Sequence, residues 1–221
     1  MNICVGIISY FPDNDALRLA RMNTFIQLID KCNLCFNIPI FVIAQNYTDE
    51  EKELICSKNN IVLYEHPKLG ITGARKELRK VFLESGYDYL IMLDDDCIIR
   101  GKPEEGKKYL EELRAHPGGY AAKRKRLLKL FAISKEIYSE MDMPDVRPEE
   151  NEGYEDAIFT ETLRTKYPFR EFVFRNHLVE FSDSSTDPNS TWRNECKKTL
   201  NRKLLSERTT LAIHRAKGLR K

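Results

Sequence analysis

The strongest constraint on the fold is an alternation of short apolar segments with segments of helical spacing. The apolar segments are rich in β-branched and aromatic residues and carry little charge, as strands buried on both faces do. Between them, apolar side chains recur every three or four residues, which is typical of helices that cover a sheet. This alternation predicts an α/β fold with a doubly wound, mostly parallel sheet. We expect strands at 2–9, 38–44, 61–64 and 87–93, and helices at 15–32, 48–57 and 74–85.

The first and third of these helices carry features that bear on the site. In helix 15–32 the apolar side would consist of Leu17, Ala20, Phe25, Leu28 and Ile29, with Arg18, Arg21 and Lys31 on the other side. The segment Gly70-Ile71-Thr72-Gly73 is expected to precede the third helix.

Polar residues follow the predicted strands. They are Ser9, Gln45-Asn46, His66 and the triplet Asp94-Asp95-Asp96. In open α/β sheets, ligands bind outside the carboxyl ends of the strands. The sequence therefore predicts that these side chains gather at one edge of the sheet and form the ligand site.

The second half of the sequence is less regular. It predicts helices at 104–113, 154–167 and 191–217 and strands at 127–133 and 169–174, with a basic run at 123–126 and an acidic segment at 140–156. We expect one domain over residues 1–190, divided near residue 100, followed by a basic amphipathic C-terminal helix at 191–221.

The formal net charge of +2 conceals an uneven distribution. Residues 193–221 carry a net charge of +8, whereas residues 1–192 carry −6. Trp192, Cys196, Leu200 and Leu204 recur every four residues, so one stripe of the terminal helix would be apolar and the rest basic. Either this helix packs on the core with a solvated cationic face, or it docks on an anionic membrane surface, a lipid phosphate or a nucleic acid.

No signal peptide or transmembrane segment is expected. The N-terminal apolar run is short, lacks a basic region and is interrupted by Gly6. The six cysteines lie mostly in apolar segments, as buried reduced thiols do. For the lone CxxC pair, Cys32 and Cys35, structural thiols are expected, with zinc or redox chemistry as the alternative. These features predict a cytoplasmic protein, peripheral to the membrane if the basic helix docks on lipid.

The aspartate triplet 94–96 predicts a metal site. Three consecutive carboxylates after a buried strand are costly unless a cation neutralises them. In an extended segment Asp94 and Asp96 would point the same way and Asp95 away from them. Carboxylate oxygens at this spacing suit Mg²⁺ or Mn²⁺, which leave coordination positions for phosphates. The alternative is a solvated acidic turn.

Two motifs in this order resemble a known family. Gly70-Ile71-Thr72-Gly73-Ala74-Arg75, a helix, and then a strand ending in the aspartate triplet resemble the nucleotide-binding half of GT-A glycosyltransferases related to family 2. About 60 residues on, Gly153-Tyr154-Glu155-Asp156 is similar to their Glu-Asp motif. The resemblance covers roughly residues 3–177 and implies a GT-A-like, Rossmann-like fold. Residues 1–100 would be the nucleotide-sugar-binding half and 101–190 the acceptor half.

The resemblance implies a nucleotide site at the ends of the first two strands. Ser9 and Tyr10 would line the base, with the Tyr10 ring available for stacking. Family 2 enzymes usually end their second strand in acidic residues, whereas Gln45 and Asn46 stand here. Their amides can still hydrogen-bond a base edge, and this strand end also resembles, more faintly, that of family 7 galactosyltransferases. The expected donor is a nucleotide-diphosphate sugar, a UDP-sugar in the first place.

The resemblance also implies where the diphosphate and its metal bind. Arg75 would lie near the diphosphate, where a guanidinium suits oxyanions; the alternative is a solvent-facing arginine. Asp94 would contact the ribose, with Asp95 part of the same nucleotide site. Asp94, Asp96 and His177 would hold Mn²⁺ or Mg²⁺, although His177 taken alone fits a structural or surface histidine equally well.

Glu155 and Asp156 are the candidate catalytic residues. Transfer with inversion needs a base that takes the proton of an acceptor hydroxyl, and a carboxylate at a helix N-terminus is well placed for it. Asp156 would be this base, and Glu155 would orient the acceptor or the structure. Plain helix capping by acidic residues is the alternative. The acceptor would be a glycan or a lipid-linked sugar.

Two other functions stay open at this point. A nucleotidyltransferase shares the nucleotide-binding sheet and the metal carboxylates, but it usually has a Gly-rich, basic loop after its first strand, which Ser9-Tyr10-Phe11-Pro12-Asp13 lacks. A non-catalytic module that binds nucleic acid or a protein partner through the basic tail is the other, and it assigns no role to the aspartate triplet or to Asp156.

Overall fold

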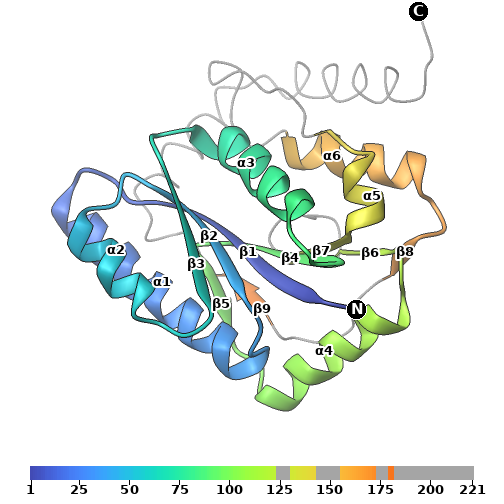
Figure 1. Cartoon of the computed structure of the whole chain (residues 1–221), viewed down its shortest axis with the longest axis horizontal. Coiled ribbons are helices and arrows are strands. Elements are labelled where there is room, and N and C mark those ends of the chain that lie inside the picture. Colours follow the sequence, from blue (N-terminus) through green and yellow to red (C-terminus); the bar gives the residue numbers. More distant parts are fainter. Residues whose placement is uncertain (123–129, 143–154, 173–178, 182–221) are drawn as a thin grey trace, which may run out of the picture.

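The computed structural model describes residues 1–122, 130–142, 155–172 and 179–181. These residues form a mostly parallel α/β sheet flanked by helices, which confirms the predicted fold class (Figure 1). The strands are β1 (Ile3–Tyr10), β2 (Ile40–Gln45), β3 (Ile61–His66), β4 (Tyr89–Asp94), β5 (Cys97–Ile99), β6 (Tyr120–Ala122), β7 (Leu130–Ser134), β8 (Glu171–Phe172) and β9 (Val179–Phe181). The helices are α1 (Asp15–Cys35), α2 (Asp49–Cys56), α3 (Gly70–Glu84), α4 (Pro103–Ala115), α5 (Lys135–Ser139) and α6 (Glu155–Lys166).

The main sheet has the strand order β3-β2-β1-β4-β7-β6-β8 in the described part of the chain. Strands β3, β2, β1 and β4 are parallel, β7 is antiparallel to β4 and to β6, and β8 is parallel to β6. β5 and β9 form a separate antiparallel pair. The chain moves outward from β1 to β3 and then places β4 on the other side of β1. The strand order therefore reverses between β1 and β4, where open α/β sheets form a crevice for ligands.

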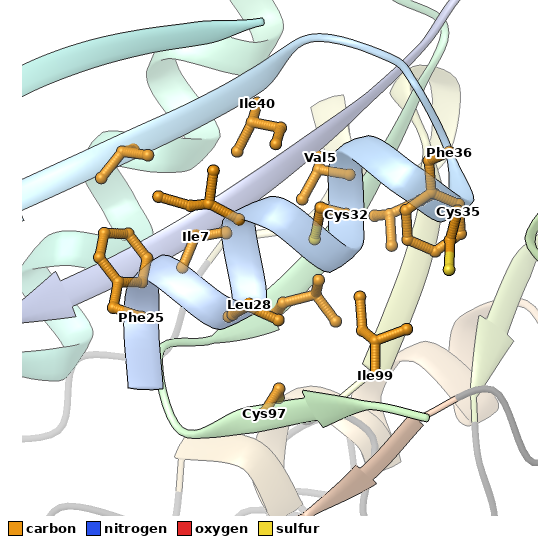
Figure 2. Close-up of a cluster of buried hydrophobic side chains, with 14 of the residues drawn as sticks. Val5, Ile7, Phe25, Leu28, Cys32, Cys35, Phe36, Ile40, Cys97 and Ile99 are labelled. Carbon is orange, nitrogen blue, oxygen red and sulfur yellow. The ribbon is translucent and has the colours of Figure 1, made fainter. Parts of the chain in front are cut away.

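The sheet separates two hydrophobic clusters. One lies toward α1 and α4, and the other toward α3, α5 and α6 (Figure 1). β1 contributes to both because its side chains alternate: Val5 and Ile7 belong to the first cluster, and Cys4 and Ile8 to the second. Figure 2 shows the first cluster, in which α1 presents Phe25, Leu28, Cys32 and Cys35 to the strands and β5 adds Cys97 and Ile99. Burial of each large apolar side chain contributes about 1.5–3 kcal/mol.

Helix α1 differs from the prediction at both ends. It extends to Cys35, and its buried side begins at Met22. Leu17, expected on the apolar side, is only partly buried, and Ala20 is exposed. The reason is that the first two turns of α1 meet the loops after β1 and β2 through Arg18 and Arg21.

The segment 70–73 was expected before the third helix, and this prediction is wrong. Gly70 to Gly73 form the first turn of α3 itself. Gly70 has φ +70°, a conformation that costs glycine little. The N-cap residue Leu69 has no side-chain cap, and its backbone N–H donates instead to Gln45 Oε1 at 2.7 Å. A contact with the end of β2 thus fixes the backbone at the start of α3.

Where the structure describes it, the second half contains predicted elements together with β5, β6, α5 and β9, which the sequence did not predict. α4 and α6 confirm the predicted helices, and β7 and β8 lie within or next to the predicted strands. The basic run 123–126, most of the acidic segment 140–156 and the terminal helix 191–217 lie outside the described residues. No helix in the described ranges carries an apolar stretch long enough to cross a membrane.

Among the described cysteines none is in a disulfide, and Cys4, Cys32, Cys35 and Cys97 are buried. Burial raises the pKa of the Cys32 and Cys35 thiols, so both are held in the neutral form. Cys35 Sγ donates to the Gly101 carbonyl oxygen at 3.5 Å. The CxxC pair is therefore part of the packing between α1 and its neighbours, as expected for structural thiols.

Gly106 provides a test of how closely α4 packs on α1. A Cβ at this position would lie 2.2 Å from the Cys35 carbonyl oxygen. We expect Gly106→Ala to lower the free energy of unfolding by about 1–3 kcal/mol, the usual cost of overpacking, although alanine favours helix formation. Urea unfolding measures the change.

Gly86→Ala is the matched control, because no atom lies within 4 Å of a Cβ added there. It is expected to leave stability unchanged or slightly raised. Equal stability of Gly106→Ala and the wild type would contradict the close approach of the two helices.

Candidate functional site

The candidate site lies where β1 and β4 end side by side. The two strands pair in parallel with Ile8 opposite Asp94. Ser9 and Tyr10 at the end of β1 therefore lie beside the aspartate triplet. The structure thus brings together, at the point of strand-order reversal, the two segments that the sequence predicted to share a ligand edge.

Asp95 joins the triplet to β1. Its Oδ2 accepts hydrogen bonds from Ser9 Oγ at 3.0 Å and from the backbone N–H of Tyr10 at 3.3 Å. Asp94 ends β4, and residues 95 and 96 form a turn before β5. The extended geometry assumed for the triplet thus ends at Asp94, and β1, rather than strand alternation, determines where Asp95 points.

The Ser9 hydroxyl both donates and accepts a hydrogen bond within the protein. It donates to Asp95 and accepts a hydrogen bond from the Tyr47 hydroxyl at 2.8 Å. Tyr47 is buried and stacks on Phe11, with ring centroids 4.2 Å apart. Ser9 is therefore part of a buried polar chain from the loop after β2 to the turn after β4. That it lines a base stays a prediction.

Asp94 is paired with Arg75 of α3. The Arg75 Nη2 lies 3.4 Å from Asp94 Oδ1, and the side chains are 3% and 25% exposed, respectively. The alternative of a solvent-facing Arg75 is therefore wrong, because this guanidinium is buried against the triplet. The Asp94 carboxylate is the more exposed of the two groups.

The amides at the end of β2 also have internal partners. Gln45 is buried, and its Oε1 accepts from Leu69 N. Asn46 has φ +61°, and its Nδ2 donates to the Phe11 carbonyl and to Asp13 Oδ1, both at 2.8 Å. Both side chains hold loops together at the site. Base recognition by these amides stays a prediction, and it would require them to leave these partners.

Tyr10 remains available for a planar ligand. Its backbone is held at both polar groups, since its N–H donates to Asp95 and its carbonyl accepts from Arg21 Nη1 at 3.1 Å. The exposed Lys68 places its Nζ 5.0 Å from the centroid of the Tyr10 ring. An aromatic ring beside an exposed cation suits a nucleobase that carries phosphates.

The triplet fits a metal site in which the protein supplies only two carboxylates. No group of three His, Cys, Asp or Glu side chains in the described residues is arranged to hold a metal ion. Asp94 and Asp96, both partly exposed, could supply two carboxylates. Such a pair suits Mg²⁺ or Mn²⁺, which takes one or two carboxylates together with substrate phosphates and water. His177 lies outside the described residues.

Glu155 and Asp156 stand at the first two positions of α6, which confirms the predicted helix start. Gly153 and Tyr154 lie outside the described residues. The catalytic roles of Glu155 and Asp156 stay predictions.

Four residues near the site were missed or given no role in the sequence. They are Arg18, Arg21, Tyr47 and Lys68. Arg18 forms two hydrogen bonds with Glu51 and others with the carbonyls of Pro12 and Asn46. Arg21 lies 3.9 Å from Asp95. Glu51 lies 33 positions from Arg18 and Asp95 lies 74 positions from Arg21, so no local pattern in the sequence could have revealed these two ion pairs.

Comparisons with known proteins support the fold. No protein-family model and no curated protein sequence matches the chain. Among solved structures, it is similar to S. aureus TarS, residues 1–349, in complex with UDP: TM-score 0.59, 14% identity, 82% of this chain and 60% of that chain covered. It thus spans about 60% of that fragment.

Two further solved structures are similar. The glycosyltransferase GlyE of Streptococcus pneumoniae TIGR4 has a TM-score of 0.52 and 15% identity, over 79% of this chain and 45% of that chain. CMP:2-keto-3-deoxy-manno-octonic acid synthetase complexed with CTP has a TM-score of 0.59 and 9% identity, over 90% of this chain and 100% of that chain. The chain therefore has a GT-A-like fold.

Asp95 gives the site a dependence on pH. Burial raises its pKa from the ordinary 3.8 to about 6, against the opposing effect of Arg21. Because the folded-state pKa is the higher one, the folded chain binds this proton more tightly. The wild type should therefore lose about 2 kcal/mol of stability relative to Asp95→Asn as the pH rises from about 4 to about 6.

Urea unfolding of both proteins across this pH range, in EDTA so that no divalent cation is bound, measures the difference. Acidic groups remote from Asp95 cancel in the comparison. A difference that does not change with pH would mean that Asp95 is not buried in the way described.

Proposed function

We propose that this GT-A-like chain is a metal-dependent glycosyltransferase that moves a sugar from a nucleotide-diphosphate sugar to an acceptor hydroxyl. The observation that carries the proposal is the aspartate triplet at the reversal of strand order between β1 and β4. Further support comes from the fold shared with TarS, which has been solved with UDP and with UDP-GlcNAc. A UDP-sugar is accordingly the proposed donor.

In this proposal the nucleotide occupies the edge formed by β1 and β4. The base stacks on the Tyr10 ring and Lys68 moves from that ring toward the phosphates. Asp94 contacts the ribose, and Asp94 and Asp96 hold Mn²⁺ or Mg²⁺. The metal, when bound, neutralises charge on the diphosphate as it leaves. The Arg75 guanidinium lies close enough to the triplet to add positive charge there.

The acceptor side belongs to α6 in the same proposal. Asp156 takes the proton from the acceptor hydroxyl as this attacks the anomeric carbon, and the sugar is transferred with inversion. Glu155 orients the acceptor. The acceptor is a glycan or a lipid-linked sugar, and the basic segment 191–221, outside the described residues, is the proposed contact with an anionic membrane surface or another polyanion.

Thermal melting against nucleotides tests donor binding. We expect UDP with Mn²⁺ to raise the melting temperature, and EDTA to abolish most of the shift, because Asp94 and Asp96 would hold the metal and its charge would offset that of the diphosphate. Asp96→Ala should lose the metal-dependent shift. Asp142→Ala, whose parent side chain is 98% exposed, should keep it.

Stabilisation by an oligonucleotide alone, with no response to UDP and Mn²⁺, would favour the non-catalytic binding module. A full metal-dependent shift in Asp96→Ala would remove Asp96 from the metal site.

Asp156→Asn tests the catalytic base. We expect turnover to fall by about 10²- to 10⁴-fold, the usual contribution of a general base, with donor affinity nearly unchanged. Sugar transfer is measured by release of the nucleoside diphosphate with a panel of acceptors, and donor affinity by calorimetry. Near wild-type turnover would show that Asp156 is not the base.

Nucleotidyl transfer is a second candidate, favoured by the similarity to the synthetase solved with CTP. That reaction uses a nucleoside triphosphate and releases pyrophosphate, whereas the proposed one uses a nucleotide sugar and releases a nucleoside diphosphate. The loop after β1 argues against it, since Phe11 is fully buried and the loop offers no glycine. Two results together would establish the second candidate. The protein would release pyrophosphate from CTP or UTP when sugar substrates are present, and it would release no nucleoside diphosphate from nucleotide sugars.

A further inference from the structure

Arg21 is the one residue of α1 described in contact with both strand ends at the site. Its Nη1 donates to the Tyr10 carbonyl at 3.1 Å and lies 3.9 Å from Asp95 Oδ2. The side chain is 30% exposed, so the guanidinium lies at the boundary between the core and the sheet edge. It therefore connects a helix on one face of the sheet to the end of β1 and to the turn after β4.

The network around Asp95 depends on that charge. The carboxylate accepts two hydrogen bonds from β1, and Ser9 is fixed in turn by Tyr47. These donors are neutral, and a nearby positive charge further offsets the desolvation of a largely buried carboxylate. Arg21 supplies part of this compensation and at the same time holds the Tyr10 carbonyl.

We propose that Arg21 is a positioning residue of the nucleotide site. Through Asp95 and the Tyr10 carbonyl it fixes the turn at residues 95–96, so that Asp94 and Asp96 keep the orientation that holds a divalent cation on the diphosphate. The inference rests on the proposed function. A lysine would be a partial substitute, because its ammonium keeps the charge but lacks the rigid, planar guanidinium and is more strongly hydrated.

Arg18 provides a matched control one turn earlier on α1. It is bonded to Glu51 and to the carbonyls of Pro12 and Asn46, and the contacts described for it do not reach the triplet. Its ion pair with Glu51 is only about 15% exposed at either side chain. Loss of Arg18 should therefore destabilise the loops after β1 and β2 without changing the metal site.

The experiment compares Arg21→Met, Arg21→Lys and Arg18→Met in the full chain. Mn²⁺ affinity is measured by electron paramagnetic resonance with saturating UDP, UDP affinity in EDTA by calorimetry, and stability by thermal melting. Partners that orient metal ligands are typically worth about 10- to 100-fold in metal affinity. We expect Arg21→Met to weaken Mn²⁺ binding by about this factor, with UDP binding in EDTA little changed, and Arg21→Lys to recover part of the loss.

Arg18→Met should lower the melting temperature and keep the wild-type Mn²⁺ affinity. Unchanged Mn²⁺ affinity in Arg21→Met overturns the inference, as does an equal loss in the two methionine variants. If Arg21→Met does not fold, Arg21→Lys decides, since wild-type Mn²⁺ affinity in that protein also overturns the inference.

The wild type separates this inference from the proposed function. A wild type that binds neither UDP nor Mn²⁺ overturns both, whereas normal wild-type binding with an unaffected Arg21→Met removes only the inference.

Discussion

The parallel pairing of β1 with β4 is the constraint on which the rest of the structure depends. It places a strand from the start of the chain beside one that begins almost ninety residues later, with both flanking helix layers packed on their alternating side chains. The same pairing brings two strand ends into register at the point where the strand order reverses. Because loops after parallel strands leave on the same edge, the hydrophobic core and the polar site have a common cause.

The negative charges of the adjacent carboxylates at this edge oppose folding unless positive charges lie near them. Coulomb repulsion within the triplet and desolvation of Asp95 both oppose folding, and Asp96 and Asp94 add to the raised pKa of Asp95. The compensation comes from different elements: Arg75 of α3 meets Asp94, and Arg21 of α1 meets Asp95. Helices from both faces of the sheet therefore contribute charge to one turn, which links the integrity of the site to the packing of both layers.

The sequence predicted those features that are encoded by local pattern. The apolar runs predicted the first four strands. Asp94 follows one of these runs, and this position predicted the edge of the sheet at which the polar residues lie, because the carboxyl ends of parallel strands lie on the same edge. Long-range contacts were not predictable in the same way. The periodicity of α1 placed Arg21 on its polar side, but only the folded chain shows that this side faces Asp95. Likewise, nothing in the sequence indicates that the Gln45 side-chain oxygen accepts a hydrogen bond from the backbone N–H of Leu69, 24 positions later.

The two arginine contacts differ in a way that suits a binding site. Asp95 has three described partners on β1 and α1 and lies mostly out of solvent, so it can hold the turn but is poorly placed to exchange them for a ligand. Asp94 is more exposed, and its 3.4 Å contact with Arg75 is long for a charged hydrogen bond. Part of the Asp94 carboxylate therefore faces solvent while Asp94 stays beside the buried Arg75 guanidinium. One aspartate thus holds the turn through β1 and α1, while its neighbour is balanced by a buried guanidinium on the other face of the sheet, so the charges of Asp94 and Asp95 are offset by separate elements.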